Sequence, residues 1–111
     1  AMLLMHENAT VTICHTGTVN LSSVIGEADI LVTASGKMES IGKEQLKKDQ
    51  IVIDVGIGWN EEKQKLCGDV RFEEAEEIVA ALTPVPGGVG SVTTGILVMH
   101  TAEAAYRRFA G

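Results

Sequence analysis

The hydrophobic residues of this chain fall mainly into short continuous runs that are separated by polar and glycine-rich segments. Residues 10–14, 29–34 and 50–55 are apolar and rich in β-branched side chains, which is typical of strands. Because the runs do not alternate with polar positions, they predict strands buried on both faces of a parallel sheet. A weaker strand is predicted at residues 67–72.

Helices are predicted between and after these strands. They lie at residues 1–7, after Asn20, around residues 42–46, at residues 73–81 and at residues 91–109. Asn20 is the expected N-cap of its helix. Alternating strands and helices indicate an α/β fold in which helices flank a parallel sheet.

The last helix carries an apolar stripe that includes Val92, Ile96 and Met99. If this helix belongs against a separate domain, the stripe is expected to be exposed or to be covered by another chain. Full burial of the stripe within this chain would contradict that expectation.

Composition and charge narrow the possible functions. A length of 111 residues with 45% apolar residues fits one globular domain. A formal net charge of −6 disfavours binding to nucleic acid or to an anionic membrane, and no apolar run approaches the ~20 residues that span a bilayer. Cys14 and Cys67 form no metal-binding or redox pair, and Cys14 is expected to be buried. We therefore expect a cytoplasmic protein without a metal site.

Three predicted strands end in small or flexible residues, where a parallel sheet binds its ligands. These ends are His15-Thr16-Gly17, Ala34-Ser35-Gly36 and Gly56-Ile57-Gly58. One such end would only mark the stop of a strand, but three of the same polarity predict a nucleotide crevice. No carboxylate follows the strand at residues 10–14, so a 2′-phosphate is not repelled. NADP is therefore the expected cofactor, with NAD possible.

The segment Thr83-Pro84-Val85-Pro86-Gly87-Gly88-Val89-Gly90 is the most specific local feature. It is either a rigid corner between a strand and a helix or a wall for a flat ligand, backed by a helix N-terminus. Known arrangements of catalytic residues are absent from the chain. Asp54 and Asp69 are expected to cap neighbouring loops, and no catalytic residue is assigned.

This segment resembles the signature of the methylenetetrahydrofolate dehydrogenase/cyclohydrolase family. Val52-Ile53-Asp54-Val55-Gly56-Ile57, Gly68-Asp69-Val70 and the run from Ala9 to His15 match the family in order and approximate spacing. The resemblance implies a Rossmann-like, NADP-binding domain over residues 1–111, lacking the first strand and its glycine loop. It also implies oxidation of methylenetetrahydrofolate with NADP, followed by hydrolysis to formyltetrahydrofolate.

The resemblance also implies roles for individual residues. The expected cofactor-binding residues are Thr16, Ser35, Gly36, Gly56, Ile57 and Thr83. The expected folate-binding residues are Pro84, Val85, Pro86, Gly87, Gly88 and Val89. Ser91 stands where the family commonly has proline and is expected to act as an N-cap, and Gly17 stands where a basic residue is frequent.

The family's amino-terminal domain, with its catalytic lysine, has no counterpart in this sequence. The resemblance therefore implies that the helix at residues 91–109 packs on that domain, that the chain alone does not turn over, and that the enzyme is a homodimer. Two alternatives stay open: a noncatalytic nucleotide-binding module, and another dehydrogenase with a Rossmann domain.

Overall fold

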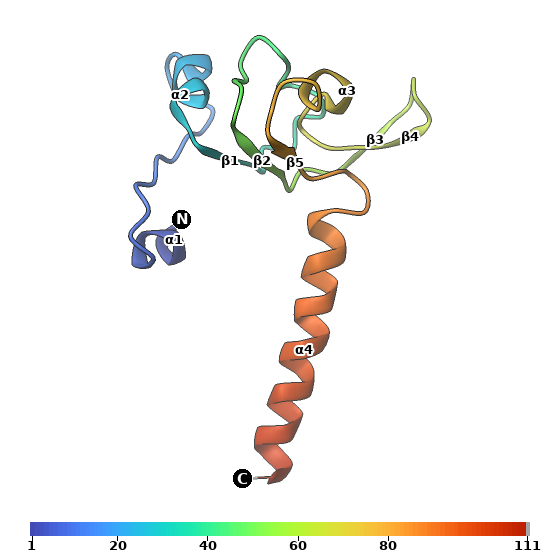
Figure 1. Cartoon of the computed structure of the whole chain (residues 1–111). Helices are drawn as coiled ribbons and strands as arrows, with labels where there is room; N and C mark the ends of the chain where they lie inside the picture. Colours follow the sequence, from blue (N-terminus) through green and yellow to red (C-terminus); the bar gives the residue numbers. More distant parts are fainter. Residues whose placement is uncertain (111) are drawn as a thin grey trace.

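A parallel sheet of short strands lies at the centre of the fold (Figure 1). The computed structural model describes residues 1–110. Strands β1 (Ile30–Thr33), β2 (Ile51–Asp54) and β5 (Ala81–Leu82) pair in parallel in the order β1-β2-β5. Ile30 is opposite Ile51, and Ile51 is opposite Ala81. The predicted strands at residues 29–34 and 50–55 are confirmed, but their predicted burial on both faces is wrong, because Ile30, Val32 and Ile51 are exposed.

A second, antiparallel pair of strands follows β2. Strands β3 (Gly58–Asn60) and β4 (Lys65–Cys67) form a hairpin. Its turn is held by side chains, because Asn60 Oδ1 accepts the Lys63 amide and the Lys63 ammonium pairs with Glu39. The charged residues of the turn are exposed, and Lys63 anchors the turn to Glu39.

Helices α2 (Leu21–Glu27) and α3 (Phe72–Ala75) belong to the sheet-containing body, and α1 (Met2–His6) lies at the start of the chain. The core gathers around Val52, which is fully buried. Its other members are Ile25, Ile41, Leu46, Val70 and Ala75. Gln50, also fully buried, donates from Nε2 to Ile25 O and Ala28 O at 2.8 and 2.9 Å. This side chain thereby donates to two carbonyls at the end of α2, of which Ile25 O also accepts the Ala28 amide.

Helix α4 (Val89–Ala110) extends away from the sheet (Figure 1). Val92, Ile96 and Met99 are 61%, 44% and 51% exposed. The expected exposure of the apolar stripe is therefore confirmed. Within residues 1–110, no helix combines the length and the apolar character needed to cross a bilayer.

The strand predicted at residues 10–14 is wrong. These residues have no regular secondary structure, and Cys14, expected to be buried, is exposed. A strand needs hydrogen bonds from a neighbour. Within residues 1–110, β1 is an edge strand that pairs with β2 along one side. No strand pairs with its other side, where residues 10–14 would need a neighbour. Apolar character alone therefore does not make this segment a strand.

Two further predicted elements differ for local reasons. Residues 42–46 form turns rather than a helix, because Ile41 is held extended by a bridge to Val70 and Gln45 Oε1 accepts the Gly42 amide. The strand predicted at 67–72 lies earlier, at β4. The amides of Asp69 and Val70 donate to the Asp54 carboxylate instead of to a neighbouring strand.

The predicted helix ends also differ. The helix predicted at residues 73–81 is the shorter α3, because the chain turns back and the amides of Ala80 and Ala81 donate to Gln50 O as β5 begins. Asn20 precedes α2 but makes no side-chain cap hydrogen bond. Ser91 is not an N-cap, since α4 begins at Val89.

Candidate functional site

A hollow of about 280 Å³ lies where β2 and β5 end. One wall comes from the segment after β2, including Gly56 and Ile57, and the other from residues 84–91 and Thr94 of α4. The structure therefore brings together residues assigned to the cofactor and residues assigned to the folate. The position of the hollow, at the carboxyl ends of parallel strands, is where open α/β sheets bind ligands.

The loop that forms the second wall is tied to β2 at its first residue. Thr83 N donates to Val52 O at 3.1 Å, and Thr83 Oγ1 accepts the Asp54 amide at 2.8 Å. Gly87 has φ of 94°, a left-handed conformation that favours glycine. A Cβ at Gly88 would meet the carbonyl oxygen of Pro84. Glycine is thus required at two successive positions for the loop to turn into α4.

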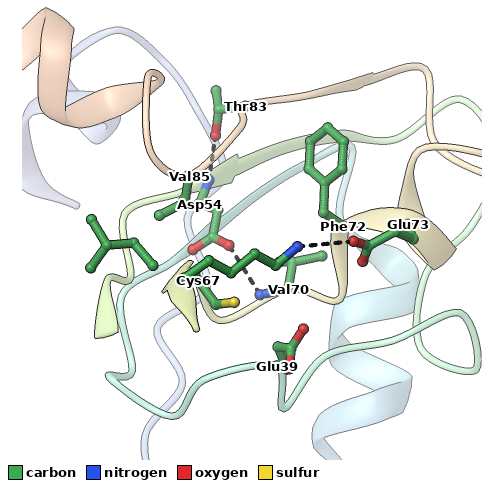
Figure 2. Close-up of a pocket in the computed structure, with 11 residues that line it drawn as sticks. Glu39, Asp54, Cys67, Val70, Phe72, Glu73, Thr83 and Val85 are labelled. Atoms are coloured by element: carbon green, nitrogen blue, oxygen red, sulfur yellow. Dashed lines mark hydrogen bonds and ion pairs between the residues drawn. The ribbon is translucent and has the colours of Figure 1, made fainter. Parts of the chain in front are cut away.

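Asp54 joins the strand ends through its carboxylate. Oδ1 accepts the Thr33 hydroxyl at 3.1 Å and the Gly56 and Asp69 amides at 3.0 and 3.1 Å. Oδ2 accepts the Val70 amide at 3.0 Å (Figure 2). The side chain is 3% exposed. The predicted capping role of Asp54 is confirmed, and it joins the ends of β1 and β2 to the segment after β4.

Asp69 makes the next connection. Its Oδ2 accepts both the amide and the hydroxyl of Ser35, at 2.7 and 3.0 Å. The Ser35 hydroxyl in turn accepts the Lys37 amide at 3.2 Å, and Gly36 between them has φ of 75°. The capping role predicted for Asp69 is confirmed. The buried carboxylate of Asp69 therefore holds the loop of Ser35 and Gly36 in place, although these two residues do not line the hollow.

The remaining residues assigned to the cofactor lie in different places. Thr16 is in an exposed turn, where His15 Nδ1 accepts the Gly17 amide at 3.0 Å, and it does not line the hollow. Thr83 lines a smaller cavity of about 30 Å³ beside Asp54 and Val85 (Figure 2). That volume holds a water molecule or two rather than a cofactor. Among residues 1–110, no three His, Cys, Asp or Glu side chains gather as metal ligands.

Sequence reasoning missed Thr94, Asp54 and Val55 as residues that line the hollow. Ser91 and Thr94 lie on the first turns of α4 and line its wall. Their spacing of three residues, directly after the glycine-rich segment, is the signal that could have found Thr94, because residues three apart share a helix face. Both place a hydroxyl-bearing side chain in the wall.

Ion pairs and hydrogen bonds shift several pKa values, and three residues of these ion pairs, Glu39, Lys65 and Glu73, line the smaller cavity. A backbone hydrogen bond and the ion pair with Lys65 lower the pKa of Glu73, and Lys65 Nζ lies 3.3 Å from Glu73 Oε1 (Figure 2). A backbone hydrogen bond and Arg71 lower the pKa of Glu44, while Glu44 raises the pKa of Arg71. Glu39 raises the pKa of Lys63. These groups are exposed, so salt screens their interactions.

The Glu73 pair predicts a small dependence of stability on pH. Because the pKa of Glu73 in the folded chain lies below its ordinary value of 4.5, the stabilisation is complete above that value and is lost as the pH falls through the folded pKa. We expect Glu73→Gln to lower Tm slightly at about pH 7 and to have a smaller effect at about pH 3. Thermal unfolding followed by circular dichroism measures this, with the exposed Glu76→Gln as the matched control. An effect of Glu73→Gln that is equal at both pH values would contradict the prediction.

Comparisons with known proteins agree with the sequence motifs. A family model described as "Tetrahydrofolate dehydrogenase/cyclohydrolase, NAD(P)-binding domain" matches residues 1–109. The bifunctional protein FolD of Bdellovibrio bacteriovorus is 51% identical over 108 residues, which cover 97% of this chain and 38% of the relative. FolD of Clostridium botulinum is 53% identical over 107 residues, with 96% and 38% covered.

Solved structures show the same similarity. The FolD methylenetetrahydrofolate dehydrogenase/cyclohydrolase of Campylobacter jejuni superposes with a TM-score of 0.92 at 38% identity, covering 98% of this chain and 38% of that one. The Trypanosoma brucei enzyme, solved with NADP and an inhibitor, gives a TM-score of 0.88 at 36% identity, covering 100% and 40%. The chain thus spans about two fifths of the length of these relatives.

Proposed function

Because the chain belongs to the tetrahydrofolate dehydrogenase/cyclohydrolase family and matches its NAD(P)-binding domain, we propose that it is the cofactor-binding part of a bifunctional folate enzyme. In this proposal, the enzyme oxidises methylenetetrahydrofolate to methenyltetrahydrofolate with NADP and hydrolyses the product to formyltetrahydrofolate. The observation that carries the proposal is the hollow in which the Gly56–Ile57 turn faces the 84–91 loop. The T. brucei enzyme, which superposes over the whole chain, was solved with NADP.

The hollow fits the reacting end of a dinucleotide better than a whole one. A volume of about 280 Å³ is near the lower end of the roughly 300–1,000 Å³ typical of small-molecule sites. In the proposed complex, backbone groups at Gly56 and Ile57 bind the nicotinamide end, with Thr83 beside it. Ser35 and Gly36 follow along the strand ends, and Thr16 lies at the adenosine end.

The proposed folate side is the wall formed by residues 84–89. Two prolines, whose rings fix the backbone angle φ, stiffen this wall, so it orients a flat ring with little loss of entropy. Its apolar side chains exclude water from the ring that it holds. The redox chemistry itself is that of the bound cofactor.

Proton handling is proposed to come from outside the chain. Of the residues that line the hollow within 1–110, Asp54 is the only charged one, and four hydrogen bonds occupy its carboxylate. Hydride transfer needs positioned reactants, but hydrolysis needs a group that moves protons. We infer that a lysine of the family's amino-terminal domain is that group, and that residues 91–109 of α4 pack on this domain. The exposed stripe of α4 supports this arrangement.

The proposal predicts binding without turnover for the chain alone. We expect NADP to bind, since the strand-end loops are formed, and we expect no oxidation of methylenetetrahydrofolate above the rate without protein. Calorimetric titration with NADP and NAD, with an absorbance assay on the same sample, measures both. Absence of NADP binding at millimolar concentration contradicts the proposed cofactor role. Turnover by the purified chain contradicts the inferred lysine in another domain.

The proposal also includes the cellular form of the enzyme. We infer a cytoplasmic homodimer, which the net charge of −6 and the family membership support. Sedimentation equilibrium tests the dimer. The alternative of a noncatalytic nucleotide-binding module predicts that NADP binds equally well with and without folate. It also predicts no oxidation of methylenetetrahydrofolate when an amino-terminal domain from a relative is added.

A further inference from the structure

We propose that Asp69 is a positioning residue for the cofactor site: it holds the Ser35–Gly36 loop against the Gly56 turn, so that both present their backbone to the dinucleotide. This inference rests on the proposed function. Asp69 is 1% exposed, and it lies outside the residues that line the hollow. It therefore acts through its neighbours rather than by contact with the ligand.

Asp69 anchors Ser35 through one carboxylate oxygen. One oxygen, Oδ2, accepts two bonds from Ser35, at 2.7 Å from the amide and 3.0 Å from the hydroxyl. Bonds to an ionised acceptor are roughly twice as strong as neutral ones. They span 34 residues of sequence, from the end of β1 to the segment after β4. Without these two bonds, Ser35 would be held only by residues of its own exposed loop, in which Gly36 has a left-handed conformation.

The other carboxylate oxygen of Asp69 packs against Gly56. Asp69 Oδ1 is buried and has no hydrogen-bond partner within residues 1–110. It lies against Gly56, where a Cβ would overlap it. A buried carboxylate oxygen without a hydrogen-bond partner lowers the stability of the fold. Asp69 therefore keeps this position because the packing and the bonds to Ser35 hold it there. The glycine at 56, which the sequence assigns to close approach of the cofactor, is also required to make room for Asp69.

A second aspartate and glycine, Asp54 and Gly68, repeat this packing. A Cβ at Gly68 would overlap the Asp54 carboxylate, and the Asp54 Oδ1 atom accepts the amides of both Gly56 and Asp69. Each aspartate thus packs against a glycine beside the other. The two carboxylates and two glycines form one buried unit that sets the spacing between the loops after β1 and β2.

The test compares substitutions at Asp69. Asp69→Ala removes both anchors and is expected to weaken NADP binding about tenfold or more. Asp69→Asn keeps an oxygen that accepts from Ser35, and its amide nitrogen takes the place of Oδ1, which has no hydrogen-bond partner to lose. The NADP affinity of this variant is therefore expected to stay within about threefold of wild type. Ser35→Ala keeps the amide bond and is expected to lie between the two. Calorimetry gives the dissociation constants, and hydrogen exchange measured by NMR gives the protection of the Ser35 amide.

A matched control separates positioning from general loss of stability. Val79→Ala removes packing from the core away from the site and is expected to lower stability without changing NADP affinity. Equal NADP affinity of the wild type and Asp69→Ala, or an unchanged Ser35 amide in Asp69→Ala, overturns the inference. A wild type that does not bind NADP overturns the proposed function instead, and the Ser35 exchange still decides whether Asp69 holds the loop.

A double substitution provides a second test. Gly56→Ala is expected to lower the protection of the Ser35 amide against hydrogen exchange, because its methyl group displaces Asp69 from Ser35. If so, Gly56→Ala combined with Asp69→Ala lowers this protection no more than Asp69→Ala alone. A Gly56→Ala variant whose Ser35 amide keeps the wild-type protection would overturn the proposed unit.

Discussion

Asp54→Ala is expected to lower the free energy of unfolding by about 3–5 kcal/mol, the largest effect of a single substitution in this chain. The carboxylate is almost fully buried and accepts four hydrogen bonds. Alanine leaves the Thr33 hydroxyl and three backbone amides without an acceptor in a place that water reaches poorly. The ends of β1 and β2 and the segment after β4 then lose their common anchor.

Asp54→Asn separates the charge from the hydrogen bonds. Its oxygen can occupy the position of Oδ1 and keep three donors, but its amide nitrogen then faces the Val70 amide at the position of Oδ2. Two donors facing each other repel, so we expect a smaller loss of about 1–2 kcal/mol. The order of stability should therefore be wild type, then Asn, then Ala.

Urea unfolding measures this order, followed by the fluorescence of Trp59, the single tryptophan of the chain. Trp59 lies in β3, next to the segment that Asp54 anchors. The control is Asp29→Ala, which removes an exposed carboxylate just before β1. An Asp54→Ala variant within about 1 kcal/mol of wild type would show that the shared anchor does not support the strand ends.

Gly88→Ala is expected to lower the free energy of unfolding by about 1–3 kcal/mol and to open the wall of the hollow. The added methyl group would meet the carbonyl oxygen of Pro84, with Thr83 Cβ at 3.2 Å and Pro84 Cδ at 3.3 Å. These neighbours are a backbone carbonyl, a Cβ atom and a proline ring, which are all fixed to the main chain, so they cannot move aside as the end of a flexible side chain would. The loop itself has to shift.

Gly95→Ala is a matched control for this prediction. Gly95 lies inside α4, and a Cβ there meets nothing within 4 Å. The same chemical change is expected to stabilise the helix by up to about 1 kcal/mol, because alanine is the better helix former. Urea unfolding of both variants, with hydrogen exchange of the Val92 amide that donates to Gly88 O, measures the contrast. Equal effects of the two substitutions would contradict the steric argument.

Local pattern was sufficient for the elements whose stability depends on their own residues and on one neighbouring strand. The runs at 29–34 and 50–55 are strands in the structure because each supplies the other with a ladder of hydrogen bonds. The stripe on α4 was predictable because helical periodicity places Val92, Ile96 and Met99 on one face, and their exposure follows from the absence of a facing element within residues 1–110. Residues 10–14 are rich in β-branched side chains, as β1 is, but they lack such a partner, so the sequence pattern predicted a strand that does not form.

The sequence by itself determined the fold class, the family and the segments that form the hollow, because strand runs and a rigid Pro-Gly loop are local properties read over a few residues. Tertiary structure alone decided which donors the two buried aspartates bind. Asp54 and Thr33 are 21 residues apart, and Asp69 and Ser35 are 34 apart. Such contacts depend on how parallel strands are paired, and pairing brings together groups whose separation along the chain carries no periodic signal.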